Sequence, residues 1–407
     1  MKRRWLGSLA LAALVAGGLA AQGVKQQIEY VADIDDWQVA VYAGAANADG
    51  FVQGPLREAG IGRNAWSMCF FPDGQGFMAV DGVVLTFTRD GIVRFLAGNP
   101  GATGYQDGPA SQALLGRQIS ICPDGQGGLW LGDRSNRCIR RLKKQDGRWT
   151  VETVAGDPLA TVSEKQLERV REEGKLPDGQ VRPTDGRGKQ AVFAYLHSNI
   201  SADADGHAWI MDSDFLRKIA PDGTVSTLNP KGGSGIPAQD AAEPLESARF
   251  RLIMGGGMCF DGDGHLYVAD RWNHCIRQVD LKAKTVSIAV GPGGGYVDGP
   301  EKNCGFHDSP GSIVYDPYRK RFYTTGVDDW GLRVWEQGHL KSIAGGNHKN
   351  KGLEGPARDA SLHWSRVVAV DPRPPHDIYF ISGGPVWDGR LGRLFKPADQ
   401  VKKGGGQ

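Results

Sequence analysis

The 407-residue sequence carries almost no excess of either charge, with 48 Lys and Arg residues against 46 Asp and Glu. Proteins that bind nucleic acids show a basic excess or a basic stripe, so this composition argues against that function class. The sequence also lacks a Cys-x-x-Cys pair, a phosphate-binding glycine loop, a nucleophile elbow and a paired-carboxylate signature. No enzyme class is therefore indicated by a motif.

Long apolar runs are absent beyond the N-terminus. Residues 1–20 combine a basic start, an apolar run over Leu6–Ala16 and small residues up to Ala20. This pattern is typical of a signal peptide cut after Ala20, and a membrane anchor is the alternative, although the run is shorter than the ~20 residues of a spanning helix. We expect an exported mature chain (periplasm, cell envelope or outside) with no transmembrane segment and 45 basic against 46 acidic residues.

The sequence is instead rich in glycine, with 59 residues, and repeats itself. The block at 128–141 aligns without a gap to the block at 265–278, and weaker copies occupy 77–87, 207–219, 322–335 and 378–395. Each copy lies between an Asp/Gly turn and a strand that ends in Ala-Gly or a variant. Four short strands per unit (A, B, C and D) are typical of a β-propeller blade.

The ends of the repeat array predict how the ring closes. The last copy supplies A, B and C strands up to Phe395, whereas Trp37–Gly44 is a D strand without the other three. We therefore predict an all-β, six-bladed propeller with four-stranded blades over residues 37–395, closed by this N-terminal strand. Residues 21–36 form an N-terminal extension and residues 396–407 a flexible tail.

One segment interrupts the repeats. Residues 157–192 are too long for a linker, and the part from Ser163 to Gly174 reads as a short capped helix. We predict a small helical insertion here, between blades two and three, which is either a lid or a decoration.

The repeat blocks resemble a known family. The Leu-Tyr-Val-Ala-Asp…Asn-His…Ile-Arg pattern at 266–277 is similar to the NHL repeat, and the Asp-Gly-Pro linkers, as at Asp107 and Asp298, resemble those of exported bacterial NHL propellers. The resemblance implies a propeller fold but no defined activity. We expect a monomer.

Strand direction indicates which loops share a face of the ring. Strands A and C run one way and strands B and D the other, so the B–C loops and the segments leading into strand A lie on one face. Most of the long and variable segments fall there, and scaffolds concentrate function in such loops. The candidate binding residues on this face are Arg134, Trp272, His274, Asp329, Trp330 and Trp387. Packing between neighbouring loops is the alternative role for the tryptophans.

Three histidines stand near the start of an A strand: His197, His307 and His363. Because strand A is innermost in a blade, these side chains are candidate ligands for a zinc or calcium ion at the mouth of the central channel. Polar residues bonded to linker backbone are the alternative. His207, His265 and His376 are interpreted as surface turn residues. The segments Asp203–Gly206 and Asp261–Gly264 are interpreted as hairpin turns, because they lack the later ligands of a calcium loop.

Arginine recurs on strand C, and cysteines recur between blades. Arg140, Arg217, Arg277, Arg333 and Arg393 are expected to tie loop carbonyls or an aspartate such as Asp133 or Asp270. An exported chain permits disulfides, but strands A and C lie too far apart to be bridged. Buried thiols are therefore the favoured interpretation of Cys69, Cys122, Cys138, Cys259, Cys275 and Cys304.

Two function classes follow from these observations. The first is a binding or scaffold module that takes a protein, peptide or carbohydrate through its loop-rich face. The alternative is a metal-dependent enzyme at the channel mouth, because gluconolactonase-like and amidating-lyase propellers resemble this architecture. Asn199 and Asp308 would be counterparts of lactonase ligands in that case.

Overall fold

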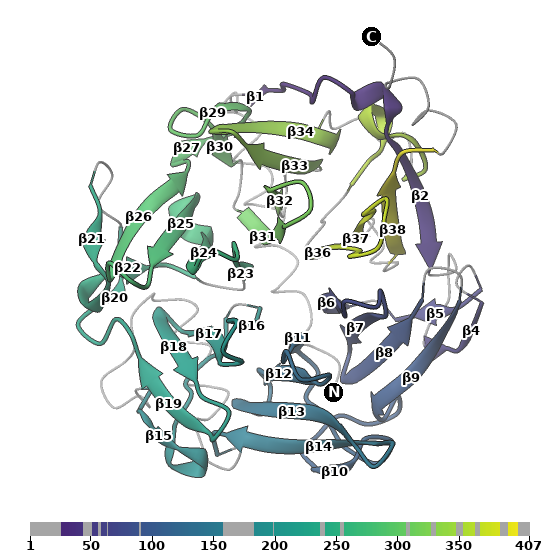
Figure 1. The fold of residues 1–407 in the computed structure, drawn as a ribbon, viewed down its shortest axis with the longest axis vertical. Helices are drawn as coiled ribbons and strands as arrows, with labels where there is room; N and C mark the ends of the chain where they lie inside the picture. Colours follow the sequence, from purple (N-terminus) through teal and green to yellow (C-terminus); the bar gives the residue numbers. More distant parts are fainter. Residues whose placement is uncertain are drawn as a thin grey trace, which may run out of the picture.

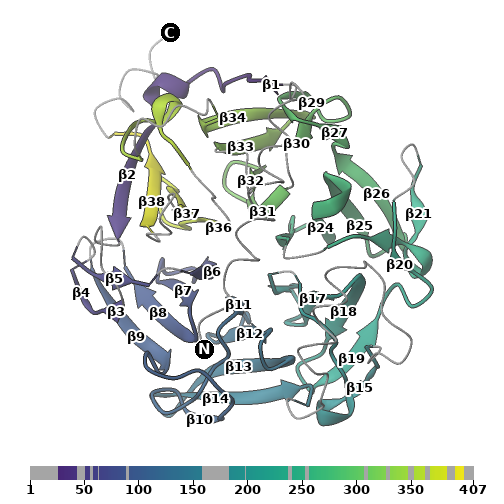
Figure 2. The same cartoon turned by 180° about the vertical axis from the view of Figure 1, so that it is seen from behind.

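The computed structural model shows sheets arranged around a central axis (Figures 1 and 2). It describes residues 26–43, 51–55, 58–62, 64–88, 91–157, 183–197, 199–236, 241–252, 256–306, 310–326, 331–346, 353–362, 367–382 and 390–397. The predicted signal peptide and the predicted helix over 163–174 lie outside these residues. Within the described part of the chain, no helix has the length and apolarity that crossing a membrane takes.

Six antiparallel sheets of five strands each occur in the described ranges, numbered here in chain order. From the outer edge inward, sheet 1 is β4 (Gly54–Pro55), β9 (Ile92–Gly98), β8 (Val83–Phe87), β7 (Gly76–Val80) and β6 (Ala65–Phe70). Sheet 2 is β10 (Gly108–Pro109), β14 (Arg148–Ala155), β13 (Cys138–Gln145), β12 (Leu129–Asp133) and β11 (Ile119–Pro123). Sheet 3 is β15 (Gly186–Arg187), β19 (Thr224–Thr227), β18 (Phe215–Ile219), β17 (Ala208–Asp212) and β16 (Ser201–Ala202).

The remaining three sheets follow the same order from edge to centre. Sheet 4 is β21 (Glu243–Pro244), β26 (Thr285–Val290), β25 (Cys275–Asp280), β24 (His265–Asp270) and β23 (Met258–Phe260). Sheet 5 is β29 (Gly299–Pro300), β34 (His339–Gly345), β33 (Gly331–Glu336), β32 (Arg321–Gly326) and β31 (Pro310–Asp316). Sheet 6 is β35 (Gly355–Pro356), β2 (Gln38–Ala43), β38 (Arg390–Phe395), β37 (Ile378–Ser382) and β36 (Val367–Val370).

Short strands and single helical turns complete the described structure. The short strands are β1 (Gln26–Gln27), β3 (Phe51–Val52), β5 (Gly60–Ile61), β20 (Gly233–Ser234), β22 (Arg249–Phe250), β27 (Gly293–Gly294), β28 (Tyr296–Val297) and β30 (Gly305–Phe306). The 3₁₀ turns are η1 (Ile34–Asp36), η2 (Gly188–Gln190), η3 (Leu245–Ser247), η4 (Arg271–Asn273) and η5 (Ala357–Asp359).

The sheets pack face to face around the axis, which explains their composition. The second strand from the centre is buried at every position in sheets 1, 2 and 3, because both of its faces lie against neighbouring sheets. Such strands need apolar residues on both sides, as in Leu129–Asp133, rather than an alternating pattern. The hydrophobic core is therefore divided into clusters between adjacent sheets, for example Trp130 with Ile210 between sheets 2 and 3.

Each sheet has one strand more than the four predicted. The linker before a sheet contributes a two-residue strand, which we call the latch strand, to that sheet's outer edge: β4, β10, β15, β21, β29 and β35. In sheet 2, Gly108 pairs with Val151 and Pro109 with Thr150. Proline suits an edge because it lacks a backbone N–H, and Gly108 adopts φ 124°, which a side chain disfavours. Two residues are too few for a period-two pattern, so the sequence did not indicate this strand.

The N-terminal segment joins sheets 5 and 6 (Figure 1). Strand β2 lies between β38, with Val39 opposite Leu394, and the latch strand β35, with Val39 opposite Gly355. Upstream, Val31 donates its backbone N–H to the Ser342 carbonyl at 3.0 Å. The predicted extension is thus paired with β28 at residues 26–27 and bonded to β34, in sheet 5, at residues 29–31.

The C-terminal part of the predicted insertion includes the latch strand of sheet 3. There β15 pairs with β19, and Thr184 forms a bridge with Val192. Residues 158–182 lie outside the described part of the chain.

Four of the five recurring arginines have the structural role predicted for them. The side chains of Arg140, Arg217, Arg277 and Arg333 are fully buried. Arg140 shows the pattern: it bonds Asp107, Asp133 and the backbone carbonyl of Leu114. The grouping of Arg393 with them is wrong, because Gly392 occupies the equivalent register position and Arg393 projects from the other face, where it pairs with Asp377.

All six cysteines are buried and free, as the sequence favoured. Burial raises the pKa of each of these thiols, because an apolar surrounding disfavours the thiolate.

Candidate functional site

The site is built on the B–C-loop face, which we call the upper face. In sheets 2, 3 and 4 the second strand ends in a buried aspartate: Asp133, Asp212 and Asp270. Each carboxylate accepts backbone N–H groups from the segment that leads into the innermost strand, at Gly116, at Ala194 and Tyr195, and at Arg251. These bonds fix the loop and the incoming segment side by side, so side chains from both lie together on the upper face.

Residues just after these aspartates hydrogen-bond each loop to its incoming segment. Arg134, Ser213 and Trp272 each donate a backbone N–H to the incoming segment: to Gln118 at 3.0 Å, to Tyr195 at 2.7 Å and to Arg251 at 3.0 Å. Two of the predicted binding residues, Arg134 and Trp272, therefore both lie on loops held against the incoming segment, although Arg134 directly follows Asp133 and Trp272 is the second residue after Asp270.

Arg134 is in contact with the next sheet. Its guanidinium carbon lies 4.2 Å from the ring centroid of Tyr195, and the Tyr195 ring lies 4.2 Å from the His197 ring. The backbone N–H of His197 donates to the Met211 carbonyl at 2.9 Å, which anchors the segment to β17. A predicted binding residue and a predicted metal ligand thus belong to one stack, which we call the Arg134 stack. A guanidinium over a tyrosine face is a favourable cation–π arrangement.

Trp272 presents the most exposed aromatic ring on this face among the described residues. It is 45% exposed, and the guanidinium carbon of Arg251 lies 5.4 Å from its ring. The turn η4 that carries it is held by Asn273, whose Nδ2 donates to the Gly235 carbonyl and to Asp270. The exposed ring is therefore held on a fixed turn.

His274 ends this turn and has a conformational role in the backbone. Its φ of 52° is in the left-handed region, and its backbone N–H donates to the Arg271 carbonyl. The side chain is half-buried.

Asp214 is a titratable group of the upper face that sequence reasoning missed. Burial raises its pKa to about 6, and the negative charge of Asp270 acts in the same direction. One carboxylate oxygen accepts the Leu252 backbone N–H at 3.2 Å, which opposes the shift. Tyr195 and Arg251 were missed as well. Their position in the sequence could have indicated them. Each lies a few residues before the innermost strand of its sheet, and this segment shares the upper face with the B–C loops that carry the candidate binding residues.

The remaining predicted residues are not placed by the structure. Asp329, Trp330, Trp387, His307 and His363 lie outside the described residues. The proposed convergence of His197 with two further histidines on a metal ion stays a prediction.

The opposite face, which we call the lower face, carries the A–B turns. Asp203 accepts the backbone N–H groups of Asp205 and His207, and also the indole N–H of Trp209. These bonds lower its pKa against the effect of burial. Asp203, Asp205 and His207 each offer one oxygen or nitrogen atom that could bind a metal ion, and these three atoms lie within 4.8 Å of one another. Since Asp203 is engaged in closing the turn, the prediction of a hairpin turn at this segment is confirmed.

The NHL repeat model matches residues 256–279, which span β23, β24 and all of β25 except its last residue. No curated protein matches the chain significantly. Among solved structures, the chain is similar to a structural genomics protein of unknown function from Bacteroides thetaiotaomicron, with a TM-score of 0.58, 12% identity, and coverage of 88% of this chain and 75% of that one.

Two further solved structures are auxiliary nutrient binding proteins. The one from Bacteroides thetaiotaomicron has a TM-score of 0.57 at 13% identity, and the one from Bacteroides ovatus has 0.57 at 14%. In both comparisons 88% of this chain and 76% of the other are covered. At such identities the similarity establishes the fold alone. Together with the ring of antiparallel sheets, it shows that the chain has a β-propeller fold, in which residues 256–279 match the NHL repeat.

Proposed function

We propose that the chain is an exported six-bladed propeller, closed by β2, that binds a protein, peptide or carbohydrate partner through its upper face. The single observation that carries this proposal is the exposed Trp272, held on a hydrogen-bonded turn and stacked by Arg251. An aromatic ring that is already ordered loses little conformational entropy on binding, and Trp and Arg dominate binding energies at interfaces.

The Arg134 stack supports the same role. It places a second arginine and two more rings on the same face, two sheets away from Trp272. Rings bind the apolar faces of sugars or side chains, and guanidinium groups bind carboxylates or carbonyls, so the face offers both kinds of contact.

The test uses Trp272→Ala and Arg134→Ala, with Tyr318→Ala as the matched control. Tyr318 is 51% exposed but lies on the A–B turn of sheet 5, on the lower face. The mature protein is applied to peptide and glycan arrays, and the dissociation constant of each ligand found is then measured. We expect both upper-face variants to bind at least tenfold more weakly, a change of ~1.4 kcal/mol, and Tyr318→Ala to bind like the native protein. Equal losses in all three variants, or none in Trp272→Ala, overturn the proposal.

A metal-dependent enzyme is the second candidate, and the position of His197 on the upper face favours it. Of its three proposed ligands, the described residues include His197 alone. Metal content of the mature protein before and after chelation tests this candidate. One zinc or calcium ion per chain that is lost in His197→Ala supports it, and a metal content unchanged by that substitution contradicts it.

A further inference from the structure

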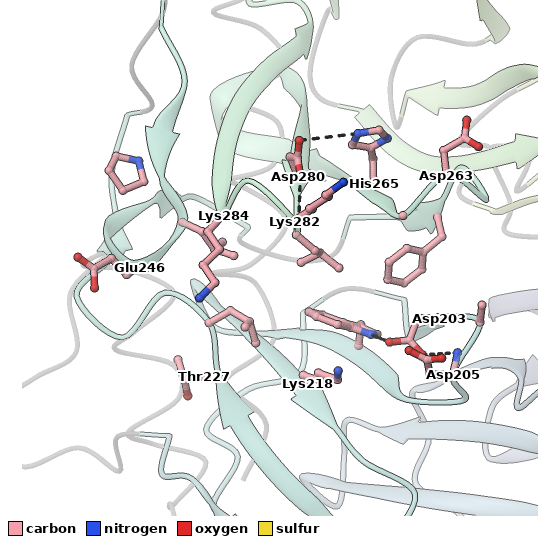
Figure 3. A pocket seen from close by; sticks show the side chains of 18 of the residues that line it. Asp203, Asp205, Lys218, Thr227, Glu246, Asp263, His265, Asp280, Lys282 and Lys284 are labelled. Carbon is pink, nitrogen blue, oxygen red and sulfur yellow. Dashed lines mark hydrogen bonds and ion pairs between the residues drawn. The ribbon is translucent and has the colours of Figure 1, made fainter.

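A groove of about 1170 Å³ lies between sheets 3 and 4 on the lower face, away from the upper-face site. Its walls come from the two A–B turns, from the C–D turn of sheet 4 and from the latch strand β21 with η3. Figure 3 shows Lys218 and Thr227 on one wall, with Lys284 and His265 on the other. The volume is somewhat larger than the ~300–1,000 Å³ typical of a small-molecule site, so a small organic molecule would fit in part of the groove.

The floor of the groove is apolar. Trp209 and Phe260 meet edge to face there, with their ring centroids 5.8 Å apart. Leu228, Leu245 and Leu281 extend the apolar lining. Trp209 is only 2% exposed, and its indole N–H is used by Asp203, so the floor is rigid and offers a ring edge and aliphatic carbon to a ligand.

Positive charge faces this floor. Lys218 Nζ lies 5.3 Å from the Trp209 ring centroid, and Lys284 is an exposed residue immediately before β26. Within the described residues, neither lysine has an ion-pair partner. A lysine without a carboxylate beside an apolar surface is a site for an external anion.

Among the described residues, no carboxylate of the lining forms an ion pair with either of these lysines. Asp203 is bonded to Trp209 and His207, Asp280 accepts the backbone N–H groups of Lys282 and Ala283, and Glu246 pairs with Lys231 at 3.0 Å. Asp205 and Asp263 lie on the two A–B turns, at the end of the groove away from Lys284 (Figure 3). Lys284 and the two turn aspartates thus lie at opposite ends of the groove (Figure 3).

We propose that this groove is a second binding site, which takes an amphiphilic anion. The apolar body of the ligand, aromatic or aliphatic, lies on Trp209 and Phe260. Its carboxylate, sulfonate or phosphate group lies between Lys218 and Lys284, within reach of the Thr227 hydroxyl. This site is independent of the upper face and does not rest on the function proposed above.

The probe for the test is 8-anilinonaphthalene-1-sulfonate, an aromatic anion, compared with uncharged N-phenyl-1-naphthylamine. Both are titrated into the native mature protein and into Lys218→Met/Lys284→Met. We expect one saturable site for the sulfonate in the native protein and an affinity at least tenfold lower in the variant. The uncharged probe should bind both proteins within a factor of two, since the floor is unchanged.

Two further variants keep the test independent of folding. Lys218→Arg/Lys284→Arg retains the charge and should bind the sulfonate within threefold of the native affinity. Lys144→Met/Lys189→Met removes the same charge from exposed positions of sheets 2 and 3 outside the groove and should leave binding unchanged. The proposal is overturned if the native protein has no saturable site for the sulfonate. Equal losses in the two methionine pairs, or no loss in the groove pair, overturn it as well.

Discussion

Arg333 and Asp298 form an ion pair in which neither side chain is exposed to solvent. Nη2 of Arg333 lies 2.8 Å from Oδ1 of Asp298, and the same guanidinium donates to the backbone carbonyls of Gly305 and Val297. The other oxygen of Asp298 accepts the Glu29 backbone N–H and the Ser342 hydroxyl. One carboxylate therefore joins the N-terminal segment, a linker and two strands of sheet 5.

Replacing Arg333 by Met should destabilise the protein by about 3–5 kcal/mol, because Asp298 is left buried without its charged partner. Arg187→Met is the matched control, since Arg187 and its partner Asp222 are 68% and 52% exposed, and it should cost less than about 1 kcal/mol. Guanidinium-induced unfolding of the three proteins gives the comparison. Similar losses in the two variants would contradict a buried ion pair at Asp298.

The stability of the protein should depend on the charge of Asp214. Its pKa of about 6 in the folded state exceeds its ordinary value of 3.8, because burial and Asp270 disfavour the carboxylate. A raised pKa in the folded state means that the contribution of this group is complete below about pH 4 and is lost as the pH rises through about 6.

Asp214→Asn removes this dependence. Relative to the variant, the native protein should lose up to about 3 kcal/mol between pH 4 and 7, following the two-unit shift. Free energies of unfolding measured at several pH values for both proteins provide the check. Parallel pH curves for the two proteins would show that Asp214 titrates normally.

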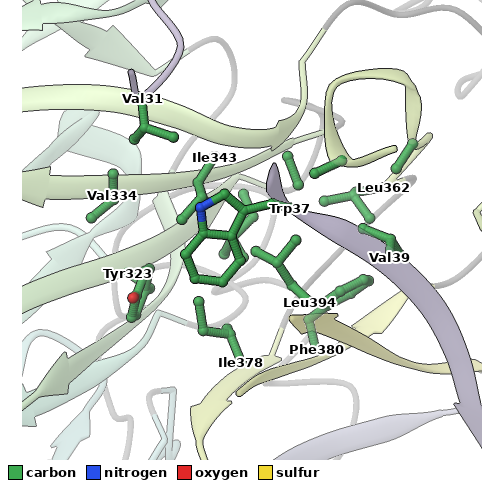
Figure 4. Close-up of a cluster of buried hydrophobic side chains, with 14 of the residues drawn as sticks. Val31, Trp37, Val39, Tyr323, Val334, Ile343, Leu362, Ile378, Phe380 and Leu394 are labelled. Carbon is green, nitrogen blue, oxygen red and sulfur yellow. The ribbon is translucent and has the colours of Figure 1, made fainter. Parts of the chain in front are cut away.

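Trp37→Ala should destabilise the protein by about 3–5 kcal/mol, the usual cost of emptying a large buried site. Trp37 is 3% exposed, and Figure 4 shows its ring among Ile343, Ile378 and Leu394, which belong to sheets 5 and 6. Trp272→Ala, the same substitution at a ring that is 45% exposed, should cost less than about 1 kcal/mol. Thermal and chemical unfolding of the pair measures the difference, and a Trp37→Ala variant as stable as Trp272→Ala would count against this packing.

The six cysteines should react with a thiol reagent only after unfolding. All six are buried, and burial raises their pKa values, so little thiolate is accessible in the folded protein. Titration with a chromogenic disulfide should find fewer than one reactive thiol per native chain and about six in guanidinium. The melting temperature should not change when a reductant is added. A lower melting temperature in reductant would indicate a disulfide.

The parts of the structure that repeat were predictable, because a repeat fixes strand order and loop position together. The alignment of 128–141 with 265–278 led to the sheets and to the structural role of Arg140 and Arg277, which are both buried. Arg393 was misassigned because the arginine of sheet 6 is shifted by one residue relative to the other sheets. Such a shift turns the side chain to the opposite face of the strand, but it leaves the residue pattern almost unchanged.

Contacts between segments with no motif could not be predicted. The Tyr195 ring meets Arg134 only because Asp133 and Asp212 hold each loop against its incoming segment. The groove between sheets 3 and 4 was missed for a related reason. Its floor joins Trp209 to Phe260, which lie on different sheets, and no local pattern connects them.

The position of β2 has a consequence for biosynthesis. This strand lies inside sheet 6, and both of its neighbours, β35 and β38, are made more than 300 residues after it (Gly355 against Ala43). Until then, Gln38–Ala43 has two open edges and an apolar face, which are the features that favour pairing with other chains. Sheet 6 can therefore be completed only after β38 has been made, and β2 is exposed to incorrect pairing until then.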